Sequence, residues 1–113
     1  KISGIIDFYF SCYDFLAYDL AILVNAWCFS KKNFKQDFYE NLIKGYQSVR
    51  PLTKNEKKKF NILLRGASMR FLMTRIFDKI HTSKKNNVTI KDPSEYLFKL
   101  KFHQSNNDSD AYF

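Results

Sequence analysis

The sequence predicts a mainly helical α+β protein with one short strand or hairpin remnant at its amino end. The strand is indicated by residues 1–7, where Ile2, Ile5 and Ile6 make a short apolar run that stops at Asp7. Helices are indicated from residue 15 onward, because apolar residues then recur every three or four positions. Capping signals ahead of several of these apolar segments support the same interpretation.

The first helix is expected over about residues 15–29. Its apolar residues run nearly all round the helix, which is typical of a buried helix rather than an amphipathic surface helix. Asp14 is placed to cap the first turn. Asp19 lies in the early turns, where a negative charge interacts favourably with the helix dipole. Both aspartates therefore have structural roles open to them.

A polar break at residues 30–32 separates this helix from the next. Asn33 and Gln36 have the spacing of a capping box, in which each side chain bonds a backbone N–H near the helix start. They predict a helix over about residues 34–48. The helix is expected to end at Arg50-Pro51, because the residue before a proline disfavours helical backbone angles.

A second capping box, formed by Thr53 and Glu56, precedes the longest periodic segment, residues 54–81. Apolar residues recur through this segment at helical spacing. Gly66 lies in its interior, and an interior glycine costs a helix about 1 kcal/mol relative to alanine. The segment is therefore consistent with one long helix or with two helices joined near Gly66.

The last helix is expected over about residues 93–102. Asp92-Pro93 is a start signal, since aspartate caps helices and proline favours the first helical position. Residues 104–113 are mostly polar, with the composition of a disordered tail. The sequence thus predicts one domain over residues 1–103 followed by this tail.

Composition argues against several classes of protein. The net charge is +8, from 19 Lys and Arg against 11 Asp and Glu, yet the lysines are scattered over every polar segment. This scatter is typical of solvated surface rather than of a nucleic-acid interface. No apolar run reaches the ~18–20 residues of a membrane span. Cys12 and Cys28 have no metal-ligand spacing and are expected to be buried, reduced thiols of a cytoplasmic protein.

Six segments of the chain form a recognisable set: residues 3–10 (SGIIDFYF), 19–21 (DLA), 25–29 (NAWCF), 45–52 (GYQSVRPL), 70–72 (RFL) and 91–93 (KDP). The strand-end aspartate followed by a helix with Asp-Leu-Ala is similar to the metal-binding segment shared by the kinase-like superfamily. Together the six segments resemble the carboxyl-terminal portion of the homoserine kinases of the aminoglycoside-phosphotransferase-like superfamily.

The resemblance implies a protein-kinase-like fold and transfer of a phosphoryl group from ATP to the hydroxyl of L-homoserine, in threonine biosynthesis. It also implies that Asp7 binds Mg²⁺, a hard cation that takes oxygen ligands and bridges phosphates. Asp19 corresponds to an aspartate that ties its helix to the catalytic loop. From the residues alone, a structural turn at Asp7 is the more frequent explanation of such a carboxylate.

Parts of a kinase are absent from these residues. There is no glycine-rich phosphate loop, no ATP-binding lysine motif and no His-x-Asp-x-x-x-x-Asn catalytic loop. The apolar run at the amino end has no preceding strand with which to pair. We therefore expect the chain to be a piece of a larger protein, inactive alone, whose missing amino-terminal lobe supplies the catalytic base and most of the ATP site.

Three of the four arginines, Arg65, Arg70 and Arg75, are spaced by five residues within the long periodic segment. The planar guanidinium binds carboxylates in a bidentate manner, which lysine cannot do. Arg70 is therefore a candidate to bind the carboxylate of an amino-acid substrate. Ordinary ion pairs with Asp78 or Glu56 are the alternative.

Two other functions remain open. The first is another small-molecule kinase of the same fold, acting on an aminoglycoside, a choline-like amine or a sugar. The second is a basic helical module that binds nucleic acid or an acidic protein. Five aromatic residues could form a cage for a quaternary amine, although core packing is the more common role of such residues: Tyr9, Phe10, Tyr13, Tyr18 and Trp27.

Overall fold

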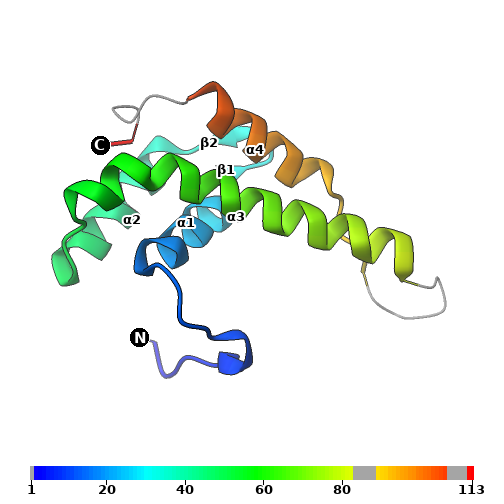
Figure 1. The fold of residues 1–113 in the computed structure, drawn as a ribbon, viewed down its shortest axis with the longest axis horizontal. Helices are drawn as coiled ribbons and strands as arrows, with labels where there is room; N and C mark the ends of the chain where they lie inside the picture. The colour runs from blue at the N-terminus through cyan, green and yellow to red at the C-terminus, as the bar shows by residue number, and fades with distance from the viewer. Residues whose placement is uncertain (1, 83–88, 107–111) are drawn as a thin grey trace.

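The computed structural model describes residues 2–82, 89–106 and 112–113 (Figure 1). It contains four α-helices, one short 3₁₀ helix and a two-stranded hairpin within these residues, so the prediction of a mainly helical protein is confirmed. In chain order the elements are η1 (Phe8–Phe10), α1 (Leu16–Trp27), β1 (Phe29–Ser30), β2 (Asn33–Phe34), α2 (Gln36–Val49), α3 (Lys54–His81) and α4 (Ser94–Ser105).

Helix α3 is the axis of the fold, and both α1 and α4 pack against it (Figure 1). It begins with the predicted capping box: Thr53 Oγ1 accepts from the Glu56 backbone N–H, and the Glu56 carboxylate accepts from the Thr53 N–H at 2.8 Å. The helix continues through Gly66 without a break. Of the two alternatives that the sequence allowed, one long helix is correct.

Two apolar clusters flank α3. The first lies between α1, α2 and the amino-terminal half of α3, and its fully buried side chains include Leu20, Val24, Phe60 and Leu64. The second lies between the carboxyl-terminal half of α3 and α4, and is built from Leu72, Tyr96 and Leu100. Buried apolar surface of this kind is the main favourable term in folding.

The expected strand at residues 1–7 is wrong for the described part of that range. Residues 2–7 have no regular structure and lead into η1. A strand needs a neighbour to pair its backbone N–H and C=O groups, and no other described segment lies alongside. The hairpin forms further along the chain, where Phe29 pairs with Phe34 and Ser30 with Asn33.

The hairpin also removes the capping box expected ahead of α2. Asn33 is part of β2, and Lys35 stands at the N-cap without any side-chain cap hydrogen bond. Gln36 donates instead to Glu40, four residues on, at 3.0 Å. The predicted capping box does not form, because Asn33 pairs with Ser30 in the hairpin. The end of the helix at Arg50, before Pro51, agrees with the sequence.

The other boundaries differ from the expected ranges by no more than three residues. Asp14 does not cap α1; its carboxylate accepts from the Phe15 N–H at 2.7 Å, one residue before the helix. Of the expected tail, residues 107–111 lie outside the described residues, while α4 extends to Ser105. Tyr112, also within that tail, is buried.

Tyr112 belongs to a network of buried hydrogen bonds around His103. Asn25 donates its Nδ2–H to the Leu64 carbonyl at 3.0 Å, so its Oδ1 is free to accept from His103 Nε2–H at 2.8 Å. His103 Nδ1 then accepts from the Tyr112 hydroxyl at 2.7 Å. His103 is therefore neutral, and burial lowers its pKa to about 4.

This pKa predicts a stability that depends on pH. An unfolded histidine binds a proton below about pH 6.5, but the folded His103 resists it until about pH 4. The contribution of neutral His103 to the free energy of unfolding is therefore complete above pH 6.5 and is lost as the pH falls toward 4. We expect the free energy of unfolding to decrease by about 2 kcal/mol between pH 7 and pH 5.

Urea unfolding followed by circular dichroism, at low protein concentration, measures this change. In His103→Gln the decrease between pH 7 and pH 5 should largely disappear, although the variant is less stable throughout. His81→Gln is the matched control, because His81 is exposed and its replacement should leave the pH dependence intact. An equal pH dependence in all three proteins would contradict a neutral, buried His103.

A row of exposed apolar side chains runs along α3. Their spacing of three, four or seven residues places them on one face of the helix: Ile62, Met69, Met73, Phe77 and Ile80, each between 44% and 70% exposed. Exposed apolar surface of this extent favours association.

We therefore predict that isolated residues 1–113 self-associate at micromolar concentration. Replacing Met69, Met73 and Phe77 together with glutamine should increase the monomer fraction in sedimentation velocity without lowering the thermal midpoint, because none of the three is buried. A monodisperse, cooperatively melting monomer in the unmodified chain would contradict the prediction.

Candidate functional site

Asp7 lies in an extended arm, residues 2–15, that precedes α1 and projects away from the helices (Figure 1). Its backbone is left-handed, with φ 70° and ψ 43°, directly before η1. Non-glycine residues rarely adopt this conformation, and aspartate is among the few that tolerate it. The side chain is exposed and makes no cap hydrogen bond. The arm thus turns at Asp7 and leaves its carboxylate open to solvent.

The three aspartates of this region do not converge. Asp14 bonds the Phe15 N–H, and Asp19 lies exposed in the first turn of α1. Within the described residues, no group of three acidic, histidine or cysteine side chains is close enough to hold a metal ion. A kinase-type Mg²⁺ needs only one or two protein carboxylates beside the substrate phosphates. Asp7 alone therefore fits part of such a site.

Of the five aromatic residues considered for a cage, Tyr18 packs against the core as expected, whereas three others are exposed. Tyr13 and Trp27 are highly exposed, Tyr9 is 76% exposed, and Tyr18 is half-buried; the Phe10 side chain lies outside what the structure describes. Tyr13, Tyr18 and Trp27 make no ring contact with one another, so these three residues form no aromatic cage. Cys12 in the same arm is exposed, and only Cys28 is the buried thiol expected.

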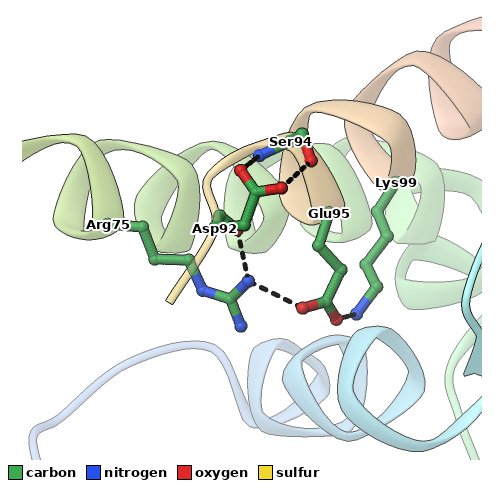
Figure 2. A network of polar contacts seen from close by, with 5 residues as sticks. All are labelled: Arg75, Asp92, Ser94, Glu95 and Lys99. Carbon is green, nitrogen blue, oxygen red and sulfur yellow. Dashed lines mark hydrogen bonds and ion pairs between the residues drawn. The ribbon is translucent and has the colours of Figure 1, made fainter. Parts of the chain in front are cut away.

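A polar network joins α3 to α4 (Figure 2). Arg75 Nη1 donates to Glu95 Oε2 at 2.7 Å and to the Asp92 carbonyl at 2.8 Å. Lys99 donates to the other Glu95 oxygen at 2.5 Å. Asp92 accepts from both the backbone N–H and the hydroxyl of Ser94, which begins α4. These contacts attach the start of α4 to the carboxyl-terminal part of α3, at Arg75.

Burial and charge set the properties of this network. Lys99 is only 2% exposed, and its ammonium lies 4.4 Å from the centre of the Tyr96 ring. Burial alone would raise the pKa of Glu95, but hydrogen bonds from Lys99 and Arg75 outweigh it and lower that pKa. The hydrogen bonds from Ser94 lower the pKa of Asp92. Both carboxylates are thus held in the charged form.

Arg70 stands apart from this network. Its side chain is exposed, and its guanidinium lies 5.4 Å from the centre of the Phe71 ring. It makes no ion pair with a described residue, so the suggested pairs with Asp78 and Glu56 are wrong. Glu56 is paired with Arg50 at 2.6 Å. The role of Arg70 in holding a substrate carboxylate stays a prediction.

Sequence reasoning missed the Arg75 network and the His103 network. Glu95 and Lys99 have the four-residue spacing of a helical ion pair, so part of the first network had a signal. No sequence signal indicated the contact between Glu95 and Arg75, which lies 20 residues away along the chain. His103 and Asn25, 78 residues apart, were visible only as polar residues on otherwise apolar helices.

No helix among the described residues is long and apolar enough to cross a membrane.

Comparisons with known proteins agree on one relationship. Residues 1–52 match the model of the phosphotransferase enzyme family, abbreviated APH. The homoserine kinase of Gluconobacter oxydans is 52% identical over 106 residues, which are 93% of this chain and 34% of that protein. Those of Gluconacetobacter diazotrophicus and Rhodospirillum rubrum are 48% and 46% identical over 98% of this chain and 35% of their own length.

The chain therefore spans about a third of the length of these relatives. The similarity reaches across the arm and all four helices, because each match covers more than nine-tenths of the chain. The resemblance that the sequence motifs carry is thus confirmed: this chain is related over almost its whole length to the homoserine kinases, and its first 52 residues match the phosphotransferase enzyme family to which that resemblance pointed.

Proposed function

We propose that the protein containing this chain phosphorylates L-homoserine with ATP. The observation that carries the proposal is the identity of about half the residues with homoserine kinases over nearly the whole chain. In this reaction the homoserine hydroxyl oxygen bonds to the γ-phosphorus, and the bond from that phosphorus to the β–γ bridging oxygen breaks. ADP leaves, and the hydroxyl proton passes to a general base. The product would enter threonine biosynthesis, a pathway expected in the cytoplasm.

Residues 1–103 would form part of the carboxyl-terminal lobe of this kinase. The relatives are about three times as long as the chain, which leaves room for an amino-terminal lobe that supplies the base and the nucleotide pocket. Other kinases of the same fold, for aminoglycosides, choline or sugars, are less well supported, because the relatives reported above all bear the name homoserine kinase.

Asp7 is the residue of this chain that would hold Mg²⁺. Two features support the role: its carboxylate is exposed without a cap hydrogen bond, and its left-handed backbone places it at a sharp turn of the arm. Strained backbone of this kind clusters at functional sites. When bound, Mg²⁺ neutralises charge that develops on the phosphates. Asp7 would hold the Mg²⁺ ion from the side of the carboxyl-terminal lobe.

Asp14 and Asp19 would have structural roles beside it. Asp14 holds the Phe15 N–H and so directs the arm into α1. Asp19 lies exposed in the first turn of that helix, where its charge complements the helix dipole. An exposed carboxylate there is also accessible to backbone N–H groups of a catalytic loop packed against α1, as the family resemblance implies.

The Mg²⁺ role predicts the effect of Asp7→Asn in the full-length protein. Asparagine keeps the size of the side chain but removes the charge, so the metal and the phosphates are positioned less well. We expect kcat to fall about 10²-fold or more, because positioning and charge neutralisation provide most of the catalysis of phosphoryl transfer. The melting temperature should change little, since the carboxylate is exposed.

The measurement is steady-state kinetics across a Mg²⁺ titration, together with a melting curve. Excess Mg²⁺ should restore part of the rate in Asp7→Asn by mass action. Asp14→Asn is the matched control: it is an exposed aspartate of the same arm, and its rate should not depend on Mg²⁺ in this way. Near-normal kcat in Asp7→Asn at ordinary Mg²⁺ would make Asp7 a structural residue.

A further inference from the structure

A cavity of about 360 Å³ lies beside the Arg75 network, between the carboxyl-terminal turns of α3 and the residues that lead into α4. Its aromatic walls are Phe71 and Tyr96, whose rings stack with centres 5.1 Å apart. Its charged lining residues are Arg75, Lys91 and Asp78, and three threonines add hydroxyl groups. A concave site with apolar walls and a few converging polar groups is typical of small-molecule binding.

Arg75 has an unused carboxylate-binding edge. A guanidinium carries five N–H donors, and Arg75 uses only Nη1 toward Glu95 and Asp92. Nε and Nη2 make no hydrogen bond to a described residue, and Figure 2 shows no contact from them to the other four residues drawn. Together they form the parallel pair of donors that binds a carboxylate bidentately.

The guanidinium is also held firmly in place. Its side chain is 14% exposed, and it lies 4.5 Å from the centre of the Tyr96 ring. Glu95 and the Asp92 carbonyl restrain the guanidinium further, because both accept hydrogen bonds from its Nη1. A guanidinium restrained before binding loses little conformational entropy when it binds a ligand.

The charges around Arg75 balance, which suits a zwitterion: Arg75, Lys99 and Lys91 are positive, whereas Glu95, Asp92 and Asp78 are negative. Glu95 is shared by two cations, Arg75 and Lys99, so the three side chains carry one excess positive charge. Lys91 adds another at the cavity wall, while Asp78 offers an acceptor for an ammonium group. A ligand with both a carboxylate and an ammonium group matches this lining.

We propose that this cavity binds the carboxylate of a small α-amino acid through Nε and Nη2 of Arg75. The proposal rests on the proposed function, under which that amino acid is the homoserine acceptor. Asp78 would hold the amino acid's ammonium group, and the threonine hydroxyls would contact its polar side chain. Arg75 thus takes the role that the sequence suggested for Arg70, whose guanidinium is exposed and is not fixed by any ion pair with a described residue.

The test compares Arg75→Lys with the unmodified full-length protein. Lysine keeps the charge but loses the pair of parallel donors. We expect the KM for L-homoserine to rise at least about tenfold, since hydrogen bonds between charged groups are the strong ones. The KM for ATP and the kcat at saturating homoserine should change little. An unchanged homoserine KM in an active Arg75→Lys enzyme overturns the proposal.

Arg50→Lys is the matched control. Arg50 also pairs with a glutamate and lies over a tyrosine ring, but it is at the end of α2 and does not line the cavity. Both variants should lose some thermal stability, and only Arg75→Lys should raise the homoserine KM. A comparable rise in both would show that Arg75 acts only through stability. If the homoserine KM rises in Arg70→Lys but not in Arg75→Lys, the substrate carboxylate is bound by Arg70 and the proposal for Arg75 is wrong.

Calorimetry without ATP separates this proposal from the proposed function. The probes are L-homoserine and L-homoserinol, which has a CH₂OH group in place of the carboxylate. The unmodified protein should prefer homoserine, and Arg75→Lys should lose that preference. If the protein does not phosphorylate homoserine yet shows this Arg75-dependent preference, the site stands and the proposed function fails. If the preference is absent, or survives in Arg75→Lys, the site is overturned.

Discussion

The fold depends on one neutral imidazole at the point where its helices meet. His103 of α4 receives a hydrogen bond from Tyr112 and donates one to Asn25 of α1, which in turn bonds the Leu64 carbonyl of α3. A buried polar group is tolerated only when its hydrogen bonds are satisfied. Because the bond from Asn25 to Leu64 determines which atom Asn25 presents to His103, the packing of α1 on α3 prepares the acceptor to which α4 bonds.

The Arg75 network has a comparable place at the other end of α3, with a different consequence. The His103 network pairs every nitrogen of its histidine and leaves no capacity for a ligand. The Arg75 network is charged and lies beside a cavity, and two nitrogens of its arginine, Nε and Nη2, make no hydrogen bond to a described residue. One network therefore stabilises the helices against each other, and the other combines that task with the geometry on which our proposal of carboxylate binding rests.

Much of the local structure was predictable because short-range signals determine it. The Thr53 and Glu56 capping box and the proline after Arg50 act over a few residues, and α2 and α3 end and begin accordingly. The strand expected at residues 1–7 failed because strand formation needs a partner, which periodicity cannot supply. Asn33 failed as a cap for a related reason, since the pairing of Ser30 with Asn33 competes with capping and no local rule ranks the two.

The sequence by itself determined the helical content, the resemblance to a kinase family and the identity of Asp7 as the carboxylate to test. It also offered three arginines at equal spacing, with Arg70 preferred, as candidates to bind a substrate carboxylate. Only the tertiary structure distinguishes them, because Arg75 contacts Glu95 and Asp92, which lie 20 and 17 residues away along the chain. Our proposal of Arg75 rests on these contacts. The neutral state of His103 was decided in the same way, by burial and by an asparagine 78 residues away. Long-range contacts set burial, charge balance and free donors, and these properties distinguish a binding arginine from a surface arginine.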